Sequence, residues 1–223
     1  MKVKTRQKII NKAIQLFNKH GYASVTLFEI AGALDMTRGN LTYHFKDKDI
    51  LLKTISDEFW GKIEIERQKR RMLPSFENMH NEVQLFYRFQ RKYAFIFLDH
   101  HVINHPAIRK KFQEMMHQSI KEMEATIAFA LSAGNMHPEP FEGIYRNLAF
   151  NFWMTSFYWI NVQMIRGDKT KKTNEEGELR LWSLLLPYLT EKGLKAFRKF
   201  FGEDYLKKLG KSFNTDLGAY VKF

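Results

Sequence analysis

The segment 37–48 carries polar side chains whose types suit hydrogen bonding to nucleic acid. Arg38 can fork onto a guanine edge, and Asn40 can pair with adenine, because their planar donor groups match those base edges. Tyr43 and His44 can reach phosphate oxygens, which position a protein on a duplex without reading its sequence. The segment therefore predicts a surface that reads bases and also contacts the phosphate backbone.

Further residues complete this predicted contact surface. Gly39 lets the backbone approach DNA closely, and Lys48 lies just beyond, where an ammonium group would meet a phosphate. Thr26 can reach a phosphate from the start of the preceding helix, where N–H groups favour an anion. The full predicted DNA-binding set is Thr26, Thr37, Arg38, Gly39, Asn40, Thr42, Tyr43, His44 and Lys48.

Three short helices are expected to position these groups. The run Ile9–Phe17 places its apolar residues on one helical face, and Gly21 is a typical C-terminal stop. Thr26 and Glu29 form a capping box, in which each side chain satisfies a free N–H group of the other residue. Alternating strand patterns are nearly absent, so we expect an all-α fold.

The third helix is expected to begin after a second N-cap at Thr37. Leu41 and Phe45 lie four residues apart and so share one face, which can anchor this helix to the core. Two short helices separated by a tight turn are typical of a helix-turn-helix, whose second helix lies in the major groove. Asp47 can cap a fourth helix, which ends before Pro74.

These motifs resemble those of the TetR family of bacterial transcriptional repressors. The resemblance rests on Gly21-Tyr22, on Thr26 to Ala31 and on the run from Thr37 to Lys48, and it covers about residues 5–60. The family commonly has tyrosine where Thr42 stands, whereas here the aromatic side chain is Tyr43.

The resemblance implies an all-helical homodimer. Residues 1–60 would form the helix-turn-helix DNA-binding domain, and residues 61–223 a larger helical domain for effector binding and dimerisation. The implied function is that of a cytoplasmic repressor, not an enzyme, that binds a palindromic operator. A small molecule would release it from DNA, and no cofactor or metal is expected.

Composition agrees with a nucleic-acid partner. The 223 residues have a formal net charge of +12, which favours polyanions. The first 71 residues are the more densely basic, with 15 Lys and Arg against 8 Asp and Glu. The chain has no cysteine, so disulfide scaffolds, thiolate zinc sites and cysteine nucleophiles are excluded. A basic protein without a polyanionic partner is the alternative.

The rest of the chain is expected to be helical as well. Ser75 can cap a helix to about residue 92, and helices are predicted over about 106–131 and 141–165. Another helix is expected from near Glu175 to about residue 201, with a kink or break at Pro187. The connection at 134–140 is expected to be a loop.

The helix at 141–165 bears aromatic side chains around its whole circumference, so several of its sides must be covered. A partner chain can supply part of that cover, which agrees with the dimer that the resemblance implies; a helix wrapped by its own domain is the alternative. The resemblance implies that this helix and the one at about 175–201 form the dimer interface, and its predicted residues are Trp153, Phe157, Trp159 and Ile160.

A ligand pocket is expected between the helices of residues 80–160. Aromatic and methionine side chains suit an apolar or aromatic ligand, although such side chains more often belong to a core. The predicted pocket residues are Phe86, Phe89, Phe95, Phe97, Phe112, Met115, Met116, Phe152 and Met154.

Two rival functions stay open at this stage. An all-helical binding protein or enzyme for a lipophilic molecule would show no sequence-dependent DNA binding. A membrane-associated protein would use the uncharged stretch 147–165, but six of its 19 residues are polar, which favours burial in protein. The cluster of His100, His101 and His105 is read as polar helix-end residues rather than as a metal site.

Overall fold

The computed structural model describes residues 2–68, 74–167 and 172–210, and these residues form helices without any β-strand. The expected all-α class is therefore confirmed. The helices are α1 (Lys2–His20), α2 (Leu27–Gly32), α3 (Arg38–His44), α4 (Lys48–Gln68), α5 (Phe76–Lys92), α6 (Ala94–Leu98), α7 (His100–Ile103), α8 (Pro106–Ser132), α9 (Ile144–Ile165), α10 (Lys172–Leu185) and α11 (Glu191–Phe201), with 3₁₀ turns η1 (Leu186–Tyr188) and η2 (Tyr205–Leu209).

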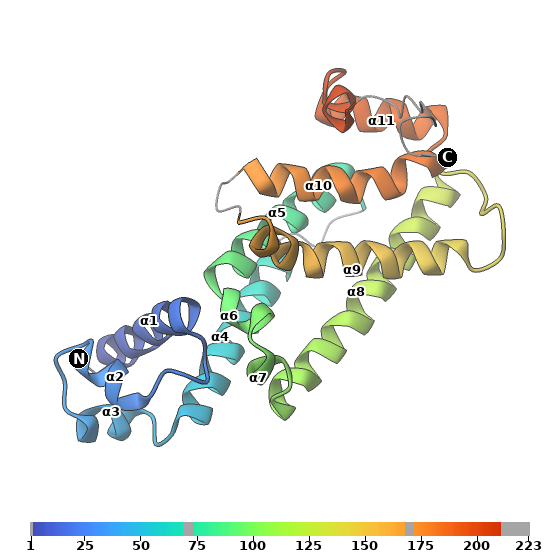
Figure 1. Cartoon of the computed structure of the whole chain (residues 1–223). Helices are drawn as coiled ribbons and strands as arrows, with labels where there is room; N and C mark the ends of the chain where they lie inside the picture. The colour runs from blue at the N-terminus through green and yellow to red at the C-terminus, as the bar shows by residue number, and fades with distance from the viewer. Residues whose placement is uncertain (1, 69–73, 168–171, 211–223) are drawn as a thin grey trace, which may run out of the picture.

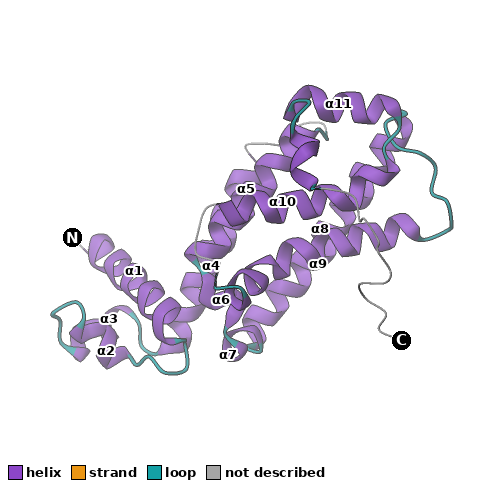
Figure 2. Cartoon of the chain, turned by 45° about the horizontal axis from the view of Figure 1, so that its top comes forward, coloured by secondary structure: helices purple, strands orange, loops and turns teal. Residues whose placement is uncertain are grey.

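The helices form an elongated molecule with two distinct ends. Helices α1, α2 and α3 cluster at one end, and α11 lies at the other (Figures 1 and 2). Between them, α9 packs against both α8 and α10. Helix α5 contacts α4, α9, α10 and α11, so it ties the two ends together.

The predicted caps of the N-terminal helices are present. Thr26 accepts a hydrogen bond from the Glu29 N–H while the Glu29 carboxylate accepts from the Thr26 N–H, which completes the capping box of α2. Thr37 caps α3 by accepting from the Asn40 N–H at 3.2 Å. Leu41 and Phe45 are both 0% exposed, so they anchor α3 to the core as expected.

Helix α4 runs without interruption across residue 60, where the sequence-based domain boundary falls. Phe59 of α4 lies in the same buried cluster as Phe17 of α1 and Phe97 of α6. The Phe59 and Phe97 ring centroids are 5.6 Å apart in an edge-to-face arrangement, which is favourable for aromatic pairs. The division into 1–60 and 61–223 thus crosses both a helix and a core, and it stays a prediction.

Several helices differ in detail from the expectation. The apolar stretch after Tyr93 forms two short helices, because the Asp99 carboxylate accepts from the His101 N–H and starts α7. Helix α9 begins at Ile144 rather than near residue 141. Its start follows Gly143, whose φ of 87° lies in the left-handed region that favours glycine.

The predicted break at Pro187 is confirmed. Helix α10 ends at Leu185, the 3₁₀ turn η1 contains the proline, and α11 starts anew behind the Thr190 N-cap. A proline within a helix removes a hydrogen bond and clashes with the preceding turn, which explains the change of direction. None of the described helices is long and apolar enough to span a bilayer.

Helices α9 and α10 approach closely where Gly177 faces Trp159. A Cβ atom placed on Gly177 would lie 2.4 Å from the indole Nε1 of Trp159. We therefore expect Gly177→Ala to lower the free energy of unfolding by about 1–3 kcal/mol, as for other overpacked cores. Urea denaturation followed by circular dichroism measures this change.

Gly61 provides a matched control in α4, where a Cβ atom would meet nothing within 4 Å. Gly61→Ala should leave stability unchanged or raise it by up to about 1 kcal/mol, since alanine is the better helix former. Equal effects of the two substitutions would show that the contact between Gly177 and Trp159 is not tight.

Candidate functional site

Helix α3 presents most of the predicted DNA-contact side chains to solvent. Arg38 and Asn40 are exposed, and 68% of Tyr43 is accessible. A Cβ atom on Gly39 would meet nothing within 4 Å, so its backbone is open to approach. Because Leu41 anchors the opposite side, the exposed side can enter a groove as a rigid unit. Thr26 and Thr37 are also exposed, while Thr42, His44 and Lys48 are half-buried.

Thr26 has a structural role that limits its use as a phosphate contact. Its backbone N–H donates to the Glu29 carboxylate at 2.7 Å, and its hydroxyl donates to the same oxygen at 2.8 Å. These hydrogen bonds hold the pKa of Glu29 below its usual range. Both Thr26 donors are thus occupied, so the predicted phosphate contact would require this cap to open.

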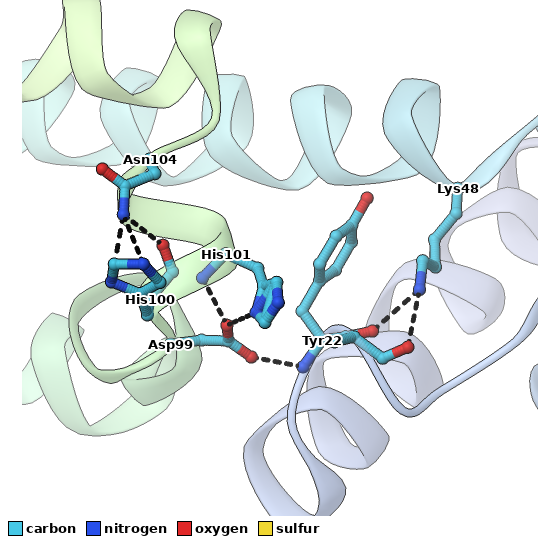
Figure 3. A network of polar contacts seen from close by, with 7 residues as sticks. Tyr22, Lys48, Asp99, His100, His101 and Asn104 are labelled. Atoms are coloured by element: carbon cyan, nitrogen blue, oxygen red, sulfur yellow. Dashed lines mark hydrogen bonds and ion pairs between the residues drawn. The ribbon is translucent and has the colours of Figure 1, made fainter.

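Lys48 also differs from the expectation of a phosphate contact. Its ammonium group donates to the Tyr22 carbonyl oxygen at 2.9 Å (Figure 3). It also donates to the carbonyl oxygens of Val25 at 2.9 Å and Ala23 at 3.3 Å. It also lies 4.3 Å from the centroid of the Tyr22 ring, within cation–π range. Partial burial lowers its pKa. Lys48 therefore fixes the α1–α2 loop, which the sequence pattern did not reveal.

The same loop is tied to the junction of α6 and α7 through Asp99. The Tyr22 N–H donates to the Asp99 carboxylate at 2.6 Å (Figure 3). Nearby, the Asn18 amide donates to the Lys92 carbonyl and accepts from the Phe95 N–H, both at 2.9 Å. These side chains connect the end of α1 to α5, α6 and α7, so the helix-turn-helix is not free to rotate independently.

A cavity of about 350 Å³ lies between α4, α5, α8 and α9. Trp60 and Ile63 of α4 form part of its wall, and Trp153 of α9 forms another part. Polar groups also line it, among them Arg67 and Glu122, which pair at 3.3 Å. The cavity combines an apolar lining with a few polar groups, which is typical of small-molecule sites.

The structure brings only some of the predicted pocket residues to this cavity. Phe86, Met115 and Phe152 line it. Phe95, Phe97 and Phe112 are instead buried in the core, and Phe89 packs against that core. Met116 is half-buried and Met154 is 41% exposed; neither is among the described cavity residues.

The predicted dimer residues lie on the covered side of α9. Phe157, Trp159 and Ile160 are 6%, 6% and 4% exposed within a single chain, and Trp153 lines the cavity. Phe157, Trp159 and Ile160 therefore leave little surface for a partner to cover, whereas Trp153 is half-buried, and the predicted dimer set stays a prediction. The exposed side of α9 carries a different apolar set at helical spacing: Phe150, Met154, Tyr158, Val162 and Ile165.

The histidines before α8 take part in local contacts. The Asn104 amide lies 3.0 Å from His100 Nδ1, and His101 Nδ1 lies 3.7 Å from the Asp99 carboxylate (Figure 3). Within the described residues, no group of three or more His, Asp or Glu side chains is placed to hold a metal ion.

Comparison with known families assigns the fold. Residues 9–55 match the family model for bacterial regulatory proteins of the tetR family. Residues 63–197, more than half of the chain, match the TetR model for a bacterial transcriptional repressor. The chain belongs to the TetR family. The members of this family are transcriptional regulators, so the resemblance of residues 5–60 is confirmed.

Individual relatives of this TetR-family chain agree with that assignment. It is 42% identical to the HTH-type transcriptional regulator AcrR of Shigella flexneri over 69 residues, 30% of this chain and 32% of that protein. It is 38% identical to the probable regulator YttP of Bacillus subtilis over 60 residues, 27% of this chain and 29% of that protein. The alignments thus span about a third of each curated relative.

Solved structures show the same fold over most of the chain. A TetR-family regulator from Marinobacter aquaeolei VT8 superimposes with a TM-score of 0.77 at 22% identity, covering 90% of this chain and 98% of the other. A complex of SmeT with triclosan superimposes with a TM-score of 0.60 at 19% identity, covering 84% and 93%.

Two groups of exposed residues in this TetR-family chain were missed by sequence reasoning. Phe28 of α2 follows the Thr26 cap and is 70% exposed, so an aromatic side chain lies at the surface of the helix-turn-helix. The apolar face of α9 that includes Tyr158 was also missed. Helical spacing from Phe150 would have found that face, but the buried side of α9 is equally apolar.

Proposed function

We propose that the chain is a sequence-specific DNA-binding repressor that acts in the bacterial cytoplasm. It binds a palindromic operator as a homodimer, and a small apolar or aromatic molecule in the cavity releases it. Residues 1–60 serve DNA binding, and residues 61–223 serve effector binding and dimerisation.

The observation that carries this proposal is the exposed side of α3. Arg38 and Asn40 supply planar donors to base edges at the start of the helix, where a recognition helix meets the groove. Tyr43 and His44 lie near the other end, at a position suited to phosphates. The helix is anchored through Leu41, so binding does not first require it to become ordered.

Dimerisation through α9 supports the palindromic operator. The face with Phe150, Met154 and Tyr158 is apolar and exposed in one chain, and α9 lies away from α1–α3 (Figure 1). An isologous contact there would relate two α3 helices by a two-fold axis, as half-sites of a palindrome require.

Helix α4 supports release by a ligand. Its first residue, Lys48, holds the α1–α2 loop, and Trp60 and Ile63 farther along line the cavity. A ligand that displaces the second half of α4, which carries Trp60 and Ile63, tilts the whole helix because α4 is continuous. The loop then moves with Lys48, and the two α3 helices of a dimer lose the spacing that matches the operator.

Selection of DNA by the purified protein tests this function. Genomic fragments retained by the protein are sequenced, and the recovered motif is tested by gel shift with and without candidate ligands. We expect an inverted repeat whose binding is lost on addition of an apolar or aromatic ligand. Equal retention of all fragments would contradict sequence-specific binding and would favour a lipophilic-ligand-binding protein.

Substitution on α9 tests the proposed dimer. Met154→Asp places a charge within the exposed apolar face, so burying it in a dimer would leave an unpaired charge. We expect the substituted protein to be monomeric at micromolar concentration by light scattering, while its helical circular dichroism is retained.

Gln113→Asp on the exposed surface of α8 is the matched control and should remain dimeric. A dimeric Met154→Asp protein would show that another surface joins the two chains. The dimer residues would then have to be sought outside the apolar face of α9.

A further inference from the structure

A second cavity of about 470 Å³ lies beside the first, and helices α5 and α8 line both. Its apolar wall includes Phe76 of α5, Ile127 and Ala130 of α8 and Ala196 of α11. The two cavities share Met79, Met123 and Thr126 as lining residues. These three side chains therefore form the boundary between the two cavities.

The shared boundary is made of groups that can move. Methionine has three rotatable bonds and adapts its shape to neighbouring groups. The Thr126 hydroxyl donates to the Glu122 carbonyl at 2.8 Å, so its polar group is already satisfied and needs no ligand. Rotation of Met79 and Met123 would therefore join the cavities without leaving a buried polar group unpaired.

The chemistry of the two cavities differs. The first contains the paired charges of Arg67 and Glu122 together with the Gln118 amide, so it can accommodate a polar group. Aliphatic and aromatic side chains predominate in the second, whose charged lining residues are Glu77 and Lys199. From Met115 to Ala130, α8 advances by about 22 Å at its usual rise per residue, which is long for a compact aromatic ligand.

We propose that the two cavities form one elongated site for an unbranched alkyl or acyl chain with a polar end. The polar end stays in the first cavity, and the chain passes Met79 and Met123 into the second. This inference rests on the proposed ligand-binding role of the first cavity and specifies the shape of the ligand.

A series of 1-alkanols from hexanol to dodecanol tests the proposal in the absence of DNA. Binding is followed by tryptophan fluorescence, since Trp60 and Trp153 line the first cavity, and by calorimetry. Burial of each added methylene should tighten binding by about fourfold. We expect the affinity of the unsubstituted protein to keep rising through dodecanol.

Ala130→Phe fills part of the second cavity without touching the two reporter tryptophans. We expect it to leave hexanol affinity unchanged and to weaken dodecanol binding at least about tenfold, the loss of roughly two buried methylenes. Ala128→Phe, at an exposed position of the same helix, is the matched control and should bind the whole series normally. Ala196→Phe narrows the same cavity from α11 if Ala130→Phe does not fold.

The results separate failure of the elongated site from failure of the proposed function. The joined site would be overturned if Ala130→Phe and Ala196→Phe both bound dodecanol within twofold of the affinity of the unsubstituted protein. The joined site would also be overturned if the affinity of the unsubstituted protein stopped rising beyond hexanol. If the chain-length series behaves as expected but no alkanol alters operator binding, only release by ligand fails.

Discussion

Replacing Arg38 with alanine is expected to weaken operator binding by about 2–6 kcal/mol per dimer. The estimate is about 1–3 kcal/mol for each bidentate contact with a base, and a dimer loses two. Arg38 is exposed in the first turn of α3, where a guanidinium can reach a base edge. Preference at one position in each half-site should relax, while binding to random DNA falls much less.

Titration against the selected operator, its single-base variants and random DNA over a range of salt measures both effects. Arg38→Lys is the sharpest control, because it keeps the charge but removes the planar fork; it should lose specificity while keeping random binding. Lys110→Ala removes one charge from the exposed surface of α8 and should change little. Equal losses on operator and random DNA for Arg38→Ala would make Arg38 a phosphate contact only.

Removal of the Glu178 carboxylate should have the largest effect on stability. The Glu178 side chain is only 2% exposed and lies 2.6 Å from His80 Nδ1. It also accepts hydrogen bonds from the Gln84 amide at 2.7 Å and the Trp182 indole at 3.1 Å. Glu178→Ala would leave these groups without their acceptor. Because each buried donor left unsatisfied costs about 1–3 kcal/mol, we expect a loss of about 3–5 kcal/mol in unfolding free energy.

Glu176, one half-turn earlier on α10, provides the matched control. It pairs with Arg166 at 2.8 Å and Arg180 at 3.3 Å on the surface, where such pairs contribute about 0–1 kcal/mol. Both alanine variants are compared by urea denaturation. Similar small losses would mean that water replaces the Glu178 contacts, and that the link between α5 and α10 is apolar.

The helix-turn-helix was predictable because its signals are local. The capping hydrogen bonds of Thr26, Glu29 and Thr37 each join residues that are three positions apart. The buried Leu41 and Phe45 are four positions apart, which is close to one helical turn. Such features depend on backbone geometry alone, so they survive without knowledge of the tertiary fold. The break at Pro187 was predictable for the same reason.

Other parts of the site depend on contacts between distant residues. Lys48 lies in a basic region, and nothing in its neighbours indicates that three carbonyl groups occupy its ammonium. Helix α9 is apolar on all sides, so periodicity could not show that Trp159 faces Gly177 while Tyr158 faces solvent. The cavity depends in the same way on four helices that meet only in the folded chain.

The continuity of α4 has a consequence for the engineering of biosensors. A hybrid regulator joined at residue 60 would cut α4 and separate Phe59 from Phe97. It would also lose the contact of Tyr22 with Asp99 unless the new sensor half supplies a carboxylate there. A transplant of the N-terminal helices should therefore carry all of α4 and be matched to a recipient whose α6 and α7 reproduce both contacts.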